Sequence, residues 1–182
     1  MFTDIVFIKD KEDALRMAKS LGFSDLLFLQ KTDLISDIKD LKRAIKPVIF
    51  VGQNDDVNRK AICSGKIDIL INVEPLIGDS LSYRKSGLNQ VLCKFAHENN
   101  VAIGINFSRL LHENDRLLLL GKIMQNIRLC RKYKVKIMLA TFANNIYELR
   151  AAKDLISLGV VLGMTPLEAK NSLTYAINRS SP

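Results

Sequence analysis

Residues 101–140 read VAIGINFSRLLHENDRLLLLGKIMQNIRLCRKYKVKIMLA, and this stretch decides the fold. It begins with the apolar run 101–106 and ends with another at 136–140, each with the length and composition of a buried strand. Between them, residues 115–133 carry apolar side chains at helical spacing, and residues 108–112 are predicted to form a single turn. Two buried strands joined by a helix of this length predict a parallel strand–helix–strand unit.

The same alternation runs through the rest of the chain. Apolar runs bounded by turn residues predict four earlier strands, at 4–8, 25–29, 47–51 and 67–73. Apolar side chains three and four residues apart predict further helices at 11–21, 33–44, 55–63, 87–99, 154–162 and 166–177. The run GVVLG at 159–163 is an alternative, short seventh strand. Parallel strands covered by helices are typical of such an alternation.

Six strands and at least six helices leave two architectures, an open doubly wound sheet or a closed (β/α) barrel. The regular alternation favours the barrel, although a full barrel uses about 250 residues and this chain has 182. No Gly-x-Gly-x-x-Gly follows the first strand, which disfavours a dinucleotide-binding sheet. We therefore expect an α/β protein of one domain over residues 1–182, folded as a compact TIM-like (β/α) barrel with six or seven parallel strands.

The excess positive charge of the chain lies in one segment. Residues 84–136 hold eleven basic and three acidic side chains, a difference of +8, which equals the net charge of the whole chain. A concentrated basic surface indicates a polyanionic partner such as RNA. The sequence lacks an apolar run of about 20 residues and a signal segment, so we expect a cytoplasmic protein without membrane contact. Its three cysteines form no CxxC pair and predict neither a zinc site nor a disulfide framework.

The helix at 115–133 is predicted to carry a cationic ridge. A helical wheel assigns its core face to Leu119, Leu120, Ile123, Ile127 and Cys130. The wheel assigns its opposite face to Lys122, Gln125, Arg128 and Lys132. No acid interrupts this ridge, whereas a solvated helix usually interleaves acidic partners four residues away. The alternative is a solvated face whose basic end, including Arg131, is favoured by the helix dipole. We predict that the ridge contacts phosphates.

Three further cations follow predicted strands. Arg84 and Lys85 lie in the long loop at 74–86, and Arg109 follows the strand at 101–106. In a barrel such loops gather at the C-terminal face of the sheet, where binding sites form. We predict RNA contacts here, the alternative being solvated loop cations. Few aromatic side chains lie on the loops: Tyr83, Phe107, Phe142 and Tyr147. Binding should therefore read the RNA backbone and shape rather than single-stranded sequence.

The sequence offers few catalytic groups. His97 and His112 are the only histidines, so a histidine-rich polynuclear metal site cannot form. Asp4, Asp68 and Glu74 lie near strand ends and could bind one magnesium ion, although such residues more often cap turns. No nucleophile elbow, Walker loop or Cys–His signature appears. We therefore predict no catalytic residue and no metal or cofactor bound by this chain.

Four sequence blocks occur in a familiar order: RKSGLN at 84–89, FS at 107–108, RLCRKY at 128–133 and LGVVLGM at 158–164. Together they resemble the ribonuclease P subunit family of about thirty kilodaltons in archaea and eukaryotes. The resemblance implies a TIM-like barrel related to the polymerase-and-histidinol-phosphatase (PHP) superfamily, without the metal ligands of that superfamily. It also implies a protein subunit of the endonuclease that removes the 5′ leader from precursor tRNA, in which the RNA subunit holds the catalytic magnesium.

The resemblance further implies partners and site residues. The implied partners are ribonuclease P RNA, precursor tRNA, a small ferredoxin-like subunit and other ribonuclease P proteins. The positions that match the family's motifs are Arg84, Ser86, Gly87, Asn89, Phe107, Ser108, Asn126, Arg128, Arg131, Lys132, Tyr133, Leu149 and Arg150. Arg131 and Arg150 thereby join the candidate RNA contacts. The chain departs from the pattern at Ala151-Ala152, where members often have Ser-Pro or Gly-Pro.

A small barrel enzyme acting on a phosphorylated metabolite is the alternative. It would hold phosphate with Arg84 and Arg109 and use a strand-end carboxylate as its base. A metabolite site does not account for three cations along an outer helix, whereas a polyanion does. A noncatalytic, RNA-binding subunit is therefore the function that we expect.

Overall fold

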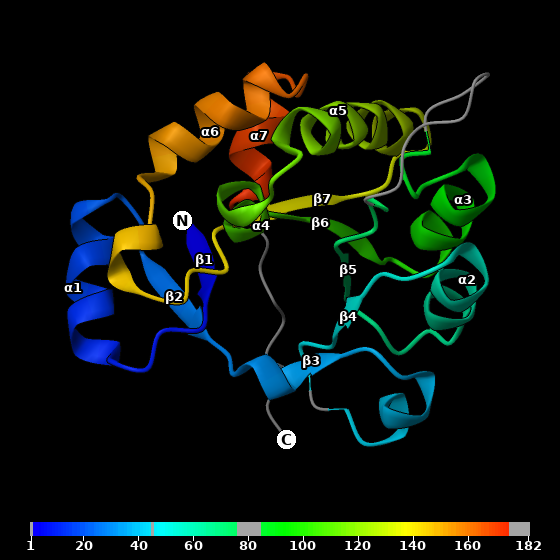
Figure 1. The fold of residues 1–182 in the computed structure, drawn as a ribbon, viewed down its shortest axis with the longest axis horizontal. Helices are drawn as coiled ribbons and strands as arrows, with labels where there is room; N and C mark the ends of the chain where they lie inside the picture. The colour runs from blue at the N-terminus through cyan, green and yellow to red at the C-terminus, as the bar shows by residue number, and fades with distance from the viewer. Residues whose placement is uncertain (1, 45, 76–84, 175–182) are drawn as a thin grey trace.

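Strands and helices alternate in the computed structural model, which describes residues 2–44, 46–75 and 85–174. The strands are β1 (Thr3–Val6), β2 (Asp25–Phe28), β3 (Leu34–Ile35), β4 (Ile49–Val51), β5 (Ile69–Ile71), β6 (Ala102–Asn106) and β7 (Ile137–Ala140). The α-helices are α1 (Lys11–Ser20), α2 (Asp55–Cys63), α3 (Gln90–Glu98), α4 (Phe107–His112), α5 (Arg116–Lys132), α6 (Ala152–Val161) and α7 (Pro166–Ser172). Short 3-10 helices are η1 (Lys31–Asp33), η2 (Ile38–Lys42) and η3 (Ile146–Glu148). In Figure 1 the strands follow an arc, with α1, α5, α3 and α2 along its outer side.

The strands form two parallel sheets that meet edge to edge. One sheet pairs β1 with β2, and the other has the order β3-β4-β5-β6-β7. The residues after β7 lie beside β1, because Phe142 N donates to the Ile5 carbonyl at 2.8 Å and Val6 forms a parallel bridge with Ala143. The prediction of an α/β fold with parallel strands is confirmed. Within the described residues no ladder joins β2 to β3, so a closed barrel stays a prediction.

An apolar cluster fills the inside of the arc. Its buried members come from six strands and from one residue that follows β7: Ile5, Leu27, Ile49, Ile69, Ile71, Ala102, Met138, Ala140 and Phe142. Gly104 of β6 leaves the room that Ile71 occupies, since a Cβ at position 104 would lie 2.6 Å from Ile71 Cγ2. The inner face is therefore packed with side chains, as in small barrels.

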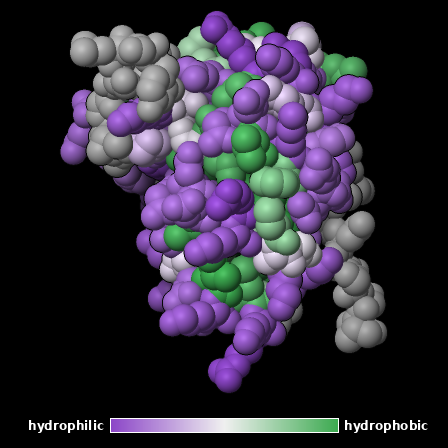
Figure 2. Space-filling model, turned by 90° about the vertical axis from the view of Figure 1, so that its right-hand side faces the viewer, coloured by the Kyte–Doolittle hydropathy of each residue, from purple (hydrophilic) through white to green (hydrophobic). Residues whose placement is uncertain are grey.

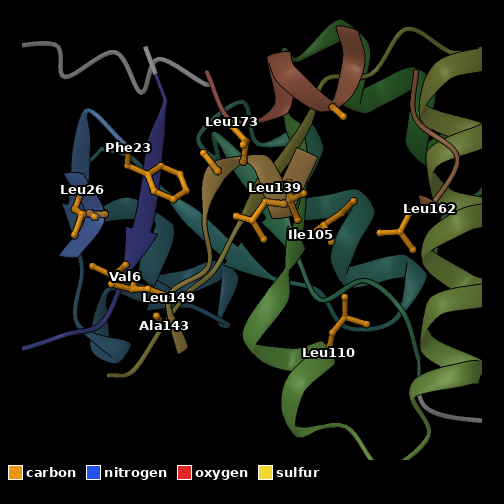
Figure 3. Packing of buried hydrophobic residues seen from close by; sticks show 14 of the residues in the cluster. Val6, Phe23, Leu26, Ile105, Leu110, Leu139, Ala143, Leu149, Leu162 and Leu173 are labelled. Atoms are coloured by element: carbon orange, nitrogen blue, oxygen red, sulfur yellow. The ribbon is translucent and has the colours of Figure 1, made fainter. Parts of the chain in front are cut away.

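Two further clusters pack the helices against the outer face of the strands. The first, drawn in Figure 3, joins α1, α5, α6 and α7 to strands that include β7, around Leu139. The second joins α2 and α3 to β4, β5 and β6, around Leu70. Helix α5 serves both, because Ile123 belongs to the first cluster and Cys130 to the second.

The predicted helix at 33–44 is wrong. This part of the chain forms the end of η1, the short strand β3 and then η2. Leu34 packs against the inner cluster and Ile35 against the second outer cluster, which is the two-residue period of a strand. Asp37 then begins η2 by accepting a hydrogen bond from Lys39 N at 2.9 Å. The apparent helical stripe arose because a strand and a 3-10 turn in sequence each send apolar side chains to a core.

Smaller differences concern helix ends. Helix α3 begins at Gln90 rather than at 87, because Asn89 Oδ1 caps it by accepting from two backbone N–H groups at 2.9 Å. Helix α6 continues to Val161, so the alternative strand at 159–163 does not form. Helix α7 ends at Ser172, short of the predicted end at 177. No described helix has both the length and the apolar character that crossing a lipid bilayer requires.

Candidate nucleic-acid interface

A buried polar network lies where α5 passes the described ends of the 74–86 loop. Lys122 is fully buried, and its Nζ donates to the Pro75 carbonyl at 2.6 Å. One helical turn later, Asn126 Nδ2 donates to Glu74 Oε1 at 3.0 Å and to the Ser86 carbonyl at 2.8 Å. Helix α5 therefore holds the chain on both sides of residues 76–84.

Glu74 is the anion of this network. Arg109 of α4 binds it twice: its Nη1 lies 3.2 Å from Glu74 Oε2, and its Nη2 donates to the Glu74 carbonyl at 2.7 Å. Burial raises the pKa of Glu74, against the opposing effects of Arg109, Asn126 and Lys122. We refer to Glu74, Arg109, Lys122 and Asn126 as the Glu74 network. Because its charges are buried together, each depends on the others for compensation.

The predicted ridge is wrong at Lys122 because the buried face of α5 turns toward the Glu74 network. Its buried residues are Leu119, Lys122, Ile123, Asn126, Ile127 and Cys130. Leu120, predicted to be core, is half-buried, as is Gln125, whereas Arg128 and Lys132 are exposed. A helical wheel gives only the position of each residue around the helix, so a lysine opposite the apolar face is expected to be exposed. It cannot show that a loop carbonyl will accept a hydrogen bond from a buried ammonium.

Exposed cations remain where α3 packs beside the C-terminal end of α5. The two helices meet where Tyr133 Oη lies 3.3 Å from Gln90 Oε1. Lys94 is exposed one turn along α3 from Gln90, on the same side of that helix. We refer to Lys94, Arg128 and Lys132 as the α3/α5 surface. Figure 2 looks onto the side of the molecule that carries α2 and α3, and shows mostly hydrophilic residues with hydrophobic ones between them.

Arg131, the next predicted cation, has an ionic partner. Its Nε donates to Glu168 Oε1 at 2.8 Å, and its Nη2 donates to the Gly163 carbonyl at 2.6 Å. The hydrogen bond from Arg131, together with that from the Thr165 backbone, lowers the pKa of Glu168 to about 2. Arg131 thus fastens α5 to the turn between α6 and α7. Its contact with RNA stays a prediction.

The predicted loop cations lie in different surroundings. Arg109 belongs to the Glu74 network and also approaches Glu113 at 4.0 Å, so its side chain is only 17% exposed. Lys85 is half-buried, and Arg84 lies outside the described residues. A metabolite phosphate would have to displace Glu74 from Arg109. The alternative of a small barrel enzyme therefore loses one of its two phosphate-binding groups.

Local geometry explains the RKSGLN motif. Gly87 has a φ of +87°, and a Cβ there would lie 1.8 Å from the Val73 carbonyl oxygen, so only glycine fits. Asn89, besides capping α3, donates to Asp55 Oδ2 at 3.0 Å and so joins α3 to the start of α2. The motif returns the chain closely past the end of β5 and into α3.

A second polar cluster lies after β6 and β7. Glu148 Oε2 accepts from the backbone N–H of Asn144 at 2.9 Å, and Glu148 Oε1 accepts from Asn145 Nδ2 at 2.9 Å. His112 Nε2 lies 3.3 Å from Glu148 Oε1, and Ser108 Oγ lies 3.4 Å from Oε2. Partial burial acts to raise the pKa of Glu148, but the bonds from Asn144 and His112 lower it. The cluster joins α4 to η3.

Arg150 and Tyr147 lie beside this cluster. The Arg150 guanidinium carbon lies 5.4 Å from the centre of the Phe107 ring. Its Nη1 donates to the carbonyls of Tyr147 and Leu149 at 2.9 and 2.8 Å. Tyr147, by contrast, is 84% exposed.

The three acids considered for magnesium do not come together. Asp4 accepts from Thr141 N at 2.7 Å and from Thr141 Oγ1, while Asp68 Oδ2 accepts from Val48 N at 2.8 Å. Burial raises the pKa of Asp4 to about 6. Among the described residues, no three His, Cys, Asp or Glu side chains are placed to share a metal ion.

Sequence reasoning named Asn126 as a motif position and Glu74 as a possible magnesium ligand, but it did not predict that the two pair in a buried network. The Asn126 side chain lies among the apolar residues of α5, and Glu74 directly follows an apolar strand. A polar residue in such a position indicates a buried partner, because burying it alone is costly. Glu148, the centre of the second polar cluster, was not singled out either, because a single acid between Tyr147 and Leu149 in a loop does not show which groups will surround it.

Parallel strands, an outer layer of helices and exposed cations on α3 and α5 define an α/β protein with a basic helical surface. Residues 23–179 match the family model described as RNase P subunit p30. The chain is 36% identical over 157 residues to Ribonuclease P protein component 3 of Methanosarcina acetivorans, covering 82% of this chain and 63% of that protein. For the protein of that name from Thermococcus gammatolerans, the identity is 35% over 170 residues, covering 91% and 75%. The chain belongs to the RNase P subunit p30 family, as its motif blocks predicted.

The fold also has a solved counterpart. A chain in the cryo-EM structure of archaeal ribonuclease P with mature tRNA matches it with a TM-score of 0.77 and 24% identity, covering 94% of this chain and 87% of that one. This likeness confirms the α/β fold. The chain spans 51–63% of the length of three Methanosarcina relatives that it matches.

Proposed function

We propose that this chain is a protein subunit of ribonuclease P, the ribonucleoprotein endonuclease that removes the 5′ leader from precursor tRNA. Membership of the family supports the proposal. The α3/α5 surface is the observation that indicates which residues bind the RNA. In this role the chain binds and supports the catalytic RNA, which holds the magnesium, and acts in the cytoplasm. It supplies no catalytic group of its own.

The buried and exposed cations have different parts in this proposal. Lys94, Arg128 and Lys132 contact RNA phosphates, because they are exposed on neighbouring helices. Lys122 and Arg109 instead hold the chain at Glu74 and Pro75, where the loop that contains Arg84 begins. Lys85, Gln125, Arg131 and Arg150 are further candidate RNA contacts.

The proposal extends to the closure of the fold and to the protein partners. The strand order and the filled inner cluster support a compact TIM-like barrel related to the PHP superfamily. A small ferredoxin-like subunit and other ribonuclease P proteins are the proposed protein partners. An apolar contact is available on the α2 and α3 side, where Val91 is 45% exposed.

The test replaces the three cations of the α3/α5 surface by glutamine. The matched control changes three exposed lysines elsewhere, Lys39, Lys42 and Lys60. Binding to ribonuclease P RNA is measured over a range of salt concentrations. The surface variant should flatten the log–log salt slope by about two to three, because each lost phosphate contact removes roughly 0.7–0.9. Both variants should fold normally, since exposed charges contribute only about 0–1 kcal/mol each.

The outcomes test the position of the RNA and the function of the chain separately. If the two triple variants lose equal RNA affinity, the RNA does not bind at the α3/α5 surface, and the positive charge attracts RNA without a defined contact. A wild-type chain that neither binds the RNA nor supports cleavage of precursor tRNA in a reconstituted enzyme would contradict the proposed function itself.

A further inference from the structure

We infer that Tyr147, with Arg150 and His112, forms a site that stacks an unpaired nucleotide of RNA. The inference rests on the proposed function and narrows the part of the RNA that this side of the molecule binds. It also differs from the expectation that binding reads backbone and shape alone.

Tyr147 presents an exposed ring on a fixed backbone. Its N–H donates to Asn145 Oδ1 at 3.0 Å, and its carbonyl accepts from Arg150 Nη1 at 2.9 Å. On either side, Ile146 packs against the first outer cluster and Leu149 is buried. The residue as a whole is 84% exposed. A tyrosine held in this way loses little conformational entropy when a flat partner stacks on it.

Two basic side chains contact the residues of this segment, Arg150 at the Tyr147 carbonyl and His112 at Glu148, and Glu148 itself already accepts several hydrogen bonds. Arg150 is fixed by two carbonyls and by the Phe107 ring, so its guanidinium is held in place beside Tyr147. The His112 side chain is 63% exposed. Glu148 accepts hydrogen bonds from Asn144 and Asn145 besides its contact with His112. An aromatic face beside basic groups is the arrangement that single-stranded nucleic acids bind.

The site is separate from the α3/α5 surface. Helix η3 packs against α1, and Figure 1 places α1 on the side of the molecule opposite α3. The cationic surface recognises phosphates, whether the RNA is paired or unpaired. Tyr147 needs a base with a free face, which a base within a duplex does not offer. The two sites should therefore respond to different substitutions and different RNA probes.

The experiment measures binding of the full chain to a fluorescently labelled single-stranded oligoadenylate and to a duplex RNA. Tyr147→Ala should weaken binding to the single strand about tenfold, the loss expected for one stacked base. Tyr147→Phe should remain within about twofold of wild type, because it keeps the aromatic face. The salt slope should not change in either variant, since no charge is lost. Duplex binding should also be unchanged.

Leu117→Ala is the matched control, because Leu117 is 87% exposed at the start of α5. Equal effects of Tyr147→Ala and Leu117→Ala would overturn the inference. Unchanged binding of Tyr147→Ala to the single strand would also overturn it. So would a Tyr147→Ala variant that no longer binds the protein partner subunit but still binds RNA as the wild type does. In each of these cases a wild-type chain that still binds ribonuclease P RNA leaves the proposed function standing. If the wild-type chain does not bind that RNA or support cleavage, the proposed function fails and the inference fails with it.

Discussion

The two faces of α5 carry the same kind of residue in opposite circumstances. Lys122 is fully buried and donates to the Pro75 carbonyl, whereas Arg128 and Lys132, two and three turns along, are exposed. On the inner face, charge is part of the fold, because Lys122 fixes one end of a loop at Pro75. On the outer face it is available to a partner. The same side-chain chemistry serves structure or binding according to its access to water.

The largest effect should come from removing the anion of the inner face. Glu74→Ala leaves Lys122 fully buried and Arg109 largely buried without the carboxylate of Glu74, and should lower the free energy of unfolding by about 3–5 kcal/mol. Urea denaturation measures the loss. Glu98→Ala, an exposed acid at the end of α3, is the control and should change stability by about 0.5 kcal/mol or less. Comparable losses in both variants would show that the network adds no stability.

Asp4 is a second buried acid, and the pH dependence of stability reports on its burial. Asp4 has its pKa raised to about 6, so the folded chain holds this proton more tightly than the unfolded chain does. Its contribution to stability is therefore present at low pH and is lost as pH rises from about 4 to about 6, by about 3 kcal/mol for a shift of this size.

Asp4→Asn should remove that part of the pH dependence and keep a side chain of the same shape. Thermal unfolding of both proteins at several pH values gives the difference between them. Glu74 titrates in both, so its contribution cancels. A difference that stays constant from pH 4 to 7 would mean that Asp4 is ionised throughout.

The most direct test of the comparison makes one substitution on each face. Lys122→Gln should cost about 1.5–3 kcal/mol, the usual range for a hydrogen bond that involves a charged group. Lys132→Gln, ten residues along the same helix, should cost about 1 kcal/mol or less. RNA affinity should show the reverse order once only folded protein is compared. If Lys132→Gln destabilises the chain as much as Lys122→Gln does, then the exposed position is structural too.

The smallest effect concerns Arg131, which lies on the boundary between the two faces. Glu168→Gln removes its ionic partner, and because both side chains are more than a third exposed, the cost at pH 7 should be about 1 kcal/mol or less. Since the pKa of Glu168 is lowered to about 2 in the folded chain, the wild-type advantage should shrink as pH falls from about 4.5 toward 2. Thermal unfolding at pH 7 and pH 3 measures the change. An advantage that grows at pH 3 would contradict the ion pair.

The strands and long helices could be predicted because their apolar residues repeat with a clear period. The predicted helix at 33–44 failed because β3 and η2 together imitate that period, and only the positions of the two cores tell them apart. Arg128 and Lys132 were assigned correctly to the exposed face of α5. The burial of Lys122 could not be predicted, because its partner is a backbone carbonyl 47 residues away in sequence. Every residue has a backbone carbonyl, so the sequence does not show which one will accept a hydrogen bond from a buried lysine.

Helix α5 also determines how the molecule comes apart. It supplies Ile123 to one outer cluster and Cys130 to the other, and Ile137 of β7 packs against both. Neither outer cluster can come apart without disturbing the packing of α5, which belongs to both. The chain should therefore unfold as one cooperative unit rather than as two. Amide hydrogens in β6, β7 and α5 should then exchange with solvent last, and at one common rate. A helix that holds a loop on one side and offers cations on the other thus also sets the cooperativity of the whole fold.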